Sequence, residues 1–226
     1  MKYCLLYFSA AICICFSCYA QPENTPEAKR WAVSLSPGTV PLPGNPFSLQ
    51  PGVEFFFTPK ISLLNEVSLQ TEKNDDFDST ALNKRYFKYK AEARYYLSAN
   101  TNRVIPYFGL QFTTASRKFD IGKADRYYDT FQDDSVYTFT SASVSSPVQT
   151  LTGQFGLSAR VIDNFYFETS FGYGIRYINT TYSAVENPEK IRNVGLFNIK
   201  PLSSYRYEGK LTRTQLNLGF RVSYRF

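Results

Sequence analysis

Apolar and polar residues alternate along the last part of the chain. From Thr214 to Phe226 the even-numbered positions are apolar, except for Thr214 itself, and the odd-numbered positions are polar or glycine. A period of two places successive side chains on opposite faces of a strand, so this stretch predicts a strand with one apolar and one polar face. Such a strand is longer than the ~5–6 residues usual in soluble proteins and suits a tilted membrane strand, which needs about 9–11 residues.

The same alternation recurs upstream. Between residues 85 and 97, an apolar face that includes Phe87 and Tyr89 opposes a face that carries Lys88 and Lys90. Counting such segments predicts eight strands, at residues 30–36, 49–58, 62–72, 85–97, 104–117, 148–161, 165–177 and 210–226.

The predicted connections alternate in length. The short ones are residues 59–60, 98–103 and 162–164, and the long ones are residues 37–46, 73–84, 118–147 and 178–209. Short turns on one side and long loops on the other are typical of an outer-membrane barrel. The predicted fold is therefore all-β, a single antiparallel up-and-down transmembrane β-barrel of eight strands, with both termini on the short-turn side. A hairpin within 118–147, where residues 136–144 resemble a strand, would raise the number to ten.

The polar positions of these strands carry charges of both signs. Eight strands that close on themselves leave an interior just wide enough for side chains to fill. Because an unpaired buried charge is costly, these residues should pair and plug the lumen rather than line an open pore. Arg225, like Arg221, occupies an odd-numbered position of the last strand, so its side chain is expected in the lumen as well. The predicted lumen charge network consists of Glu54, Glu66, Lys88, Lys90, Glu92, Arg94, Arg117, Arg160, Glu168, Arg176 and Arg221.

The first residues have the layout of a secretory signal peptide. Lys2 precedes an apolar run over residues 3–16, and small residues lead to Ala20. The predicted division is a signal peptide at 1–20, a short periplasmic segment at 21–29 and the barrel at 30–226. A membrane anchor and a lipoprotein cleaved before Cys18 are the alternatives. All four cysteines lie within the first 18 residues, so the predicted exported chain has no disulfide and no thiolate metal site.

The composition narrows the chemistry further. The chain contains no histidine, which argues against an enzyme whose nucleophile is activated by a histidine base. A hydrolase that uses only carboxylates among Glu54, Glu66, Glu92 and Glu168 is the enzymatic alternative, and no cofactor motif is present. The net charge is +6. Since an exported chain does not normally meet nucleic acid, the expected anionic partner is lipid phosphate, and the candidates for lipopolysaccharide contact are Lys118, Lys123 and Arg126.

The last strand, with its alternating apolar residues and terminal phenylalanine, resembles the C-terminal signature of outer-membrane barrel proteins. The resemblance implies that the barrel assembly machinery reads Leu218, Phe220, Val222, Tyr224 and Phe226. Residues 57–63 and 106–110 look like small porin-family or "outer membrane protein beta-barrel domain" chains, and the Ala20-Gln21 junction looks like signal cleavage in Bacteroidota-type proteins.

That resemblance implies the outer membrane of a Gram-negative bacterium, with its lipid and lipopolysaccharide as partners. The class includes structural, adhesive, channel and enzymatic members, so fold alone does not fix function. The expected role is structural or surface-interacting, through the long extracellular loops. The alternatives are a narrow channel or transporter for small solutes and a secreted soluble β-sandwich that binds a ligand. The sequence does not fix the oligomeric state.

Overall fold

The computed structural model describes residues 30–38, 48–70, 81–98, 103–121, 125–129, 136–191 and 207–226. The predicted signal peptide at 1–20 and the predicted periplasmic segment at 21–29 lie outside these residues. Among the residues described, no helix is both long and apolar enough to cross a membrane.

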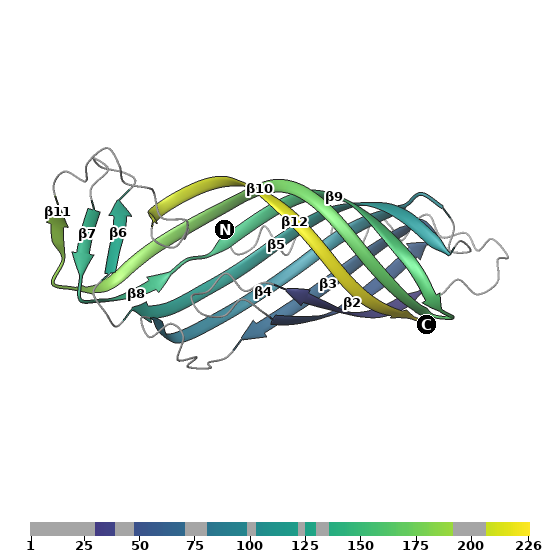
Figure 1. Ribbon diagram of the computed structural model, residues 1–226, viewed down its shortest axis with the longest axis horizontal. Helices are drawn as coiled ribbons and strands as arrows, with labels where there is room; N and C mark the ends of the chain where they lie inside the picture. Colours follow the sequence, from purple (N-terminus) through teal and green to yellow (C-terminus); the bar gives the residue numbers. More distant parts are fainter. Residues whose placement is uncertain are drawn as a thin grey trace.

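The strands form a closed ring (Figure 1). Its members are β1 (Trp31–Gly38), β2 (Ser48–Thr58), β3 (Ile61–Gln70), β4 (Ala81–Tyr96), β5 (Val104–Ile121), β8 (Ser141–Ser145), β9 (Val148–Ile162), β10 (Phe165–Glu186) and β12 (Tyr207–Arg225). Both β8 and β9 lie between β5 and β10, so together they make one stave of the barrel. The ring closes because β12 pairs with both β10 and β1, and all of these pairings are antiparallel. The prediction of an eight-stranded antiparallel barrel is confirmed.

Both chain ends of the barrel lie at the same end, which we call the terminal end. Phe226 N donates to Trp31 O at 2.8 Å, and Arg225 N donates to Asn164 O in the β9–β10 turn at 3.0 Å. The β2–β3 turn at Pro59-Lys60 is also here, where Thr58 Oγ1 accepts hydrogen bonds from two turn amides. These two short turns are confirmed; of the predicted 98–103 connection, residues 99–102 lie outside the described chain.

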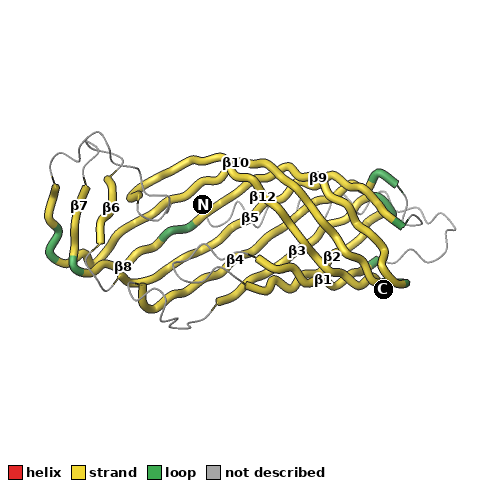
Figure 2. Tube along the Cα trace, viewed as in Figure 1, coloured by secondary structure: helices red, strands yellow, loops and turns green. Residues whose placement is uncertain are grey.

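At the opposite end, which we call the far end, the strands run further than predicted. β5 continues to Ile121 and β10 to Glu186, so much of the predicted long connections is strand (Figure 2). The reason is a change in the interior, which becomes apolar at this level. Phe119, Val144 and Tyr182 belong to a buried cluster that extends strand pairing beyond the predicted bounds.

The alternative with ten strands is wrong for the ring, although the predicted hairpin exists. β6 (Asp125–Asp129) and β7 (Val136–Phe139) pair with each other, β11 (Glu189–Ile191) adds to β7, and β6 runs parallel to the start of β12. In Figure 1 this small sheet lies at the far end, opposite the C-terminus. It extends the barrel without widening it.

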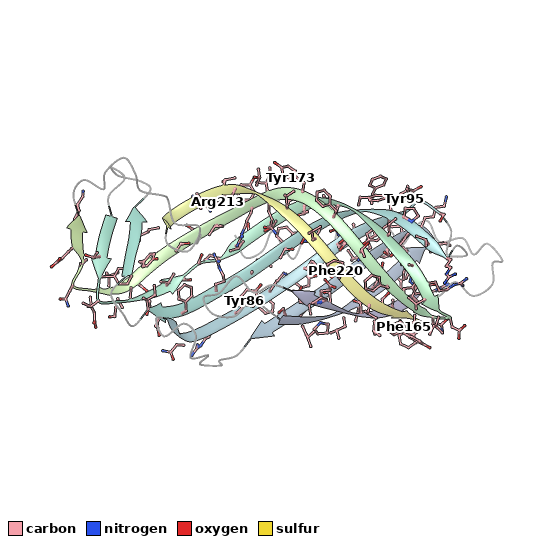
Figure 3. All side chains as sticks on the ribbon, viewed as in Figure 1. Tyr86, Tyr95, Phe165, Tyr173, Arg213 and Phe220 are labelled. Carbon is pink, nitrogen blue, oxygen red and sulfur yellow. The ribbon has the colours of Figure 1, made fainter. Side chains whose placement is uncertain are left out.

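The exterior of the ring is apolar, and the interior is polar except for the apolar cluster at the far end. Leu218 is 72% exposed and Phe171 is 53% exposed, whereas Glu54 and Glu92 are fully buried. Aromatic residues near the strand ends, such as Trp31 and Phe108, lie on the exterior, and Tyr95, Tyr173 and Phe165 project outward in Figure 3. This arrangement reverses that of a soluble protein, and the closed ring is not a two-sheet sandwich.

Candidate functional site in the lumen

The lumen at the terminal end begins with a layer of aromatic rings around an arginine. The guanidinium of Arg225 lies 3.9 Å from the ring centroid of Tyr166, 4.9 Å from that of Phe56 and 5.4 Å from that of Tyr96. It also donates to Ser158 Oγ at 3.0 Å. Arginine stacks on aromatic faces more favourably than lysine because its guanidinium is planar and weakly hydrated. The layer therefore holds a fully buried cation in place at the base of the barrel.

Next to this layer, Arg94 gathers three carboxylates. Its Nε donates to Glu92 at 2.7 Å, and its Nη1 donates to Glu168 at 3.0 Å and to Glu54 Oε2 at 3.2 Å. The three glutamates come from β4, β10 and β2, which lie on different sides of the ring. The guanidinium also sits 4.7 Å from the ring centroid of Tyr107. Arg94 thus links strands that are not neighbours in the wall.

Arg221 makes a second junction. Its Nε donates to Glu66 at 2.7 Å and its Nη1 to Glu168 at 2.9 Å, while Nη2 lies 3.7 Å from Glu92. Lys90 also pairs with Glu66. Arg225 adds a longer contact of 3.8 Å to Glu168. Glu168 is therefore shared by three arginines from β4 and β12.

The charges in this region balance. The carboxylates Glu54, Glu66, Glu92 and Glu168 face the cations Lys90, Arg94, Arg221 and Arg225. We call these eight residues the ionic plug. Serine and tyrosine hydroxyls donate further hydrogen bonds to these carboxylates, Ser62 and Tyr96 to Glu54 and Ser36 to Glu66. Buried ion pairs are tolerated when such hydrogen bonds complete them, and removing one partner is strongly destabilising.

Beyond the ionic plug the lumen contains neutral polar side chains and a cavity. The cavity has a volume of about 330 Å³ and is lined in part by Gln50, Gln111 and Thr150. Lys88 also lines it. Further toward the far end, the apolar cluster around Phe119 and Tyr182 packs across β4, β5, β8 and β10. The lumen therefore has three levels, which are the ionic plug, the polar cavity and the apolar cluster.

The structure brings together most, but not all, of the predicted charge network. Glu54, Glu66, Lys90, Glu92, Arg94, Glu168 and Arg221 join the ionic plug. Arg117 is buried higher in the lumen and donates to Ser146 O and Oγ. Lys88 and Arg176 are half-buried, and neither has an ion pair with a described residue.

Arg160 is a correction to the predicted network, because its side chain is exposed. Arg160 keeps the register of the lumen face, because it pairs with the buried Tyr166, and the β9–β10 register shift lies beyond it, on the side of the turn. It lies two residues before the end of β9, at the terminal rim of the barrel, where its long side chain reaches solvent. The alternation along β9 therefore indicates the correct face but not the exposure at the end of the strand.

The aromatic residues beside the ionic plug were not among the predicted lumen residues, which were all charged. Phe56, Tyr107 and Tyr166 have the parity of the lumen face, yet an aromatic residue in a barrel strand is expected on the lipid side. A usable signal was Gly156, which pairs with Tyr107, because a Cβ there would lie 2.3 Å from the tyrosine Cζ. A glycine opposite an inward aromatic ring indicates that the ring fills the lumen.

The remaining predicted residues lie on the outside or outside the described chain. The proposed assembly residues Leu218, Phe220, Val222, Tyr224 and Phe226 all lie on the outer face of β12. Lys118 is exposed on β5. Lys123 lies outside the described residues, and Arg126 is described only as part of the β6 backbone.

No known protein family matches this chain, and no curated protein matches it in sequence. The fold is similar to that of Acinetobacter baumannii CarO, with 9% identity and a TM-score of 0.46 over 90% of this chain and 100% of that one. It is similar to Neisserial surface protein A, with 15% identity and a TM-score of 0.38 over 87% and 95%. A major outer membrane protein from Thermus thermophilus has 14% identity and a TM-score of 0.43 over 88% and 100%.

At these identities and TM-scores the three proteins assign no residue role or activity to this chain. They also lend no support to the Bacteroidota-type resemblance of the Ala20-Gln21 junction. The evidence for a role therefore comes from the strand pairings and side-chain contacts of the chain itself.

Proposed function

We propose that this protein is an integral outer-membrane barrel of a Gram-negative bacterium, with a lumen closed by the ionic plug and a structural or surface-interaction role at its far end. One observation carries the proposal, namely the inverted distribution of side chains. Large apolar residues are exposed on the outside, and the charged residues pair inside. An apolar surface that surrounds a molecule is stable in lipid and not in water.

The orientation follows from the lengths of the connections. Short turns and both barrel termini share the terminal end, which in a barrel of this kind faces the periplasm. The far end, with β6, β7 and β11, then faces outward. We propose outer-membrane lipid and lipopolysaccharide as partners there, with the exposed Lys118 near the lipid phosphates. We further propose that the barrel assembly machinery reads the outward strip of β12 that ends at Phe226.

The ionic plug supports a closed lumen and a non-enzymatic role. Every carboxylate in it lies beside an arginine or lysine, and acid–base hydrolysis needs two carboxyl groups whose environments separate their pKa values. Passage of an ion would require these buried pairs to separate. The cavity of about 330 Å³ beyond the plug is the observation that favours the second candidate, a narrow channel for small solutes.

Membrane fractionation of the producing cells tests the proposal. We expect the full chain in the outer-membrane fraction, with an unboiled sample that migrates differently from a boiled one on a detergent gel, because a folded barrel resists detergent until it is heated. Quantitative recovery in the soluble periplasm, with no change of mobility on heating, would reject the membrane barrel.

A further inference from the structure

Within the described residues, the pairing between β1 and β12 covers only part of β12. These strands pair only from Ala32↔Arg225 to Leu35↔Val222, although β12 stays paired with β10 as far as Gly209. In the described chain no strand pairs with the other edge of β12 from Gly209 to Arg221. Figure 1 shows the two strands meeting near the C-terminus and then running apart. We call this interval the seam.

A proline accounts for the position of the seam. Trp31 O accepts from Phe226 N and Arg30 O accepts from Phe56 N, so the odd-numbered residues of β1 direct their backbone groups toward β12. Continuing the register would place Pro37 opposite Phe220. Proline has no N–H to donate to the Phe220 carbonyl. The ladder therefore ends where Pro37 stands, and β1 itself ends at Gly38.

The polar cavity reaches the seam from the inside. It is lined by lumen residues, Lys88 and Gln111 among them, and also by Pro37, Leu218 and Phe220. The last three lie on the outer face of the barrel, and Figure 3 labels Phe220 on β12. Residues from both faces of β12 therefore line the cavity at the level of the seam.

The chemistry of the seam is mixed. The even-numbered residues of β12 face β1 where the strands pair, so Phe220 and Leu218 direct their N–H and C=O groups into the seam. Lipid chains cannot satisfy such groups, and a polar occupant can. On the lumen side, Lys88 and Arg176 lack ion pairs with described residues, and Arg176 Nε is buried without a hydrogen-bond partner.

We propose that the seam binds an amphiphile with an anionic head group, a carboxylate or a phosphate, from the membrane side. The head group lies in the cavity at Lys88, and the alkyl chain lies along Leu218 and Phe220 on the outer surface. An anion pairs with Lys88, which has no ion pair with a described residue, and its oxygens accept hydrogen bonds at the seam. The ionic plug closes the cavity toward the terminal end. This inference rests on the proposed membrane location, which fractionation tests separately.

Binding to the purified full-length protein in a neutral detergent tests the inference, with native mass spectrometry as the readout. The probes are dodecyl phosphate, dodecanoate and inorganic phosphate. We expect one dodecyl phosphate or dodecanoate per barrel and no binding of inorganic phosphate at the same concentration. Lys88→Gln should weaken binding by roughly tenfold or more, as expected for a lost charge-assisted hydrogen bond. Lys60→Gln, which removes an exposed lysine in the β2–β3 turn, should leave binding unchanged.

Several results would overturn the inference. They are no saturable binding of either amphiphile, equal binding by the two lysine variants, and equally tight binding of inorganic phosphate, which would mean a site for free anions. A dimer in which a second copy covers β12 and excludes both probes would overturn it as well.

A second measurement needs no variant and so does not depend on how Lys88→Gln folds. A dodecanoate that carries a photoreactive group in its chain is cross-linked to the wild-type protein. We expect adducts concentrated on Pro37, Leu218 and Phe220. An even spread around the barrel would contradict the seam as the binding site.

Discussion

The terminal half of the lumen and the half beyond it are built from the same strands but treat charge differently. In the terminal half, Arg94 and Arg221 are each bonded to several glutamates. In the other half, Lys88 and Arg176 have no carboxylate partner in the described chain, and a cavity lies beside Lys88. The difference lies in the carboxylates: Glu54, Glu92 and Glu168 lie within four residues of the terminal ends of their strands, and Glu66 lies opposite Lys90 in the middle of β3. The alternation of faces determines that a charged side chain lies in the lumen. The position of the residue along the strand determines whether an opposite charge lies beside it.

Removing the carboxylate of Glu168, which three arginines share, should lower the stability of the barrel the most. In Glu168→Gln, Arg94, Arg221 and Arg225 lose the anion that they share, and breaking a buried pair costs about 3–5 kcal/mol. Urea unfolding in lipid vesicles should show this loss. Glu186→Gln is the matched control on the same strand, because Glu186 is exposed, and it should stay within about 0.5 kcal/mol of the wild type. Equal stability of both variants would mean that the plug does not hold the barrel together.

The second contrast is between the lumen and the exterior. Phe171→Arg places a charge in the middle of the apolar band and should cost about 2–4 kcal/mol in lipid vesicles. Asn179→Arg lies on the same face of β10 beyond the band and should cost about 0–1 kcal/mol. If the two arginines are tolerated equally, the outer face of β10 does not contact lipid.

The tightness of the plug region can be probed with two glycines of one strand. A methyl group at Gly156 would meet the ring of Tyr107 at 2.3 Å, whereas Gly153 on the outer face has no atom within 4 Å of the same position. Gly156→Ala should therefore cost about 1–3 kcal/mol through overpacking, and Gly153→Ala should be neutral or slightly stabilising. Urea unfolding again measures the difference, and a neutral Gly156→Ala would show that Tyr107 can move aside.

The smallest effect is expected at the far end, beyond the apolar band. Ser143 and Asn83 donate to the Asp120 carboxylate, both at 2.6 Å, and these hydrogen bonds lower the pKa of Asp120. A carboxylate with a lowered pKa contributes stability above its unfolded pKa of about 3.9 and loses it as the pH falls through the native pKa. Hydrogen exchange of the far-end amides of β4, β5 and β8 should accelerate below about pH 4, relative to Asp120→Asn. The same pH response in Asp120→Asn would exclude this carboxylate as the cause.

Much of the barrel could be predicted from the alternation of side chains, and the reasons for the failures are local. Period two fixes which residues face inward, so the strand with Lys90, Glu92 and Arg94 was assigned correctly. The alternation does not indicate where strand pairing stops. Because the interior near Phe119 is apolar, β5 and β10 extend beyond their predicted ends. Nor does the alternation show that Arg160, two residues before the end of β9, reaches solvent at the rim of the barrel.

The candidate site was predictable in its charges and unpredictable in its partners. Opposite charges with lumen parity indicated a plug, but the choice of Glu168 as the shared acceptor depends on the closure of the ring, which brings β4, β10 and β12 together. The seam was not anticipated at all. Its signal in the sequence is Pro37, which a prediction based on apolar alternation treats as the end of a strand.

Conductance across a planar lipid bilayer tests the central claim, that ion pairs close the lumen, most directly. With the wild-type protein reconstituted in neutral salt, we expect no stable openings, because the ionic plug spans the interior from β2 to β12. Glu168→Gln, where it still inserts, should show more frequent current fluctuations than Glu186→Gln. Long-lived openings of constant size in the wild type would contradict the closed lumen and favour the narrow channel.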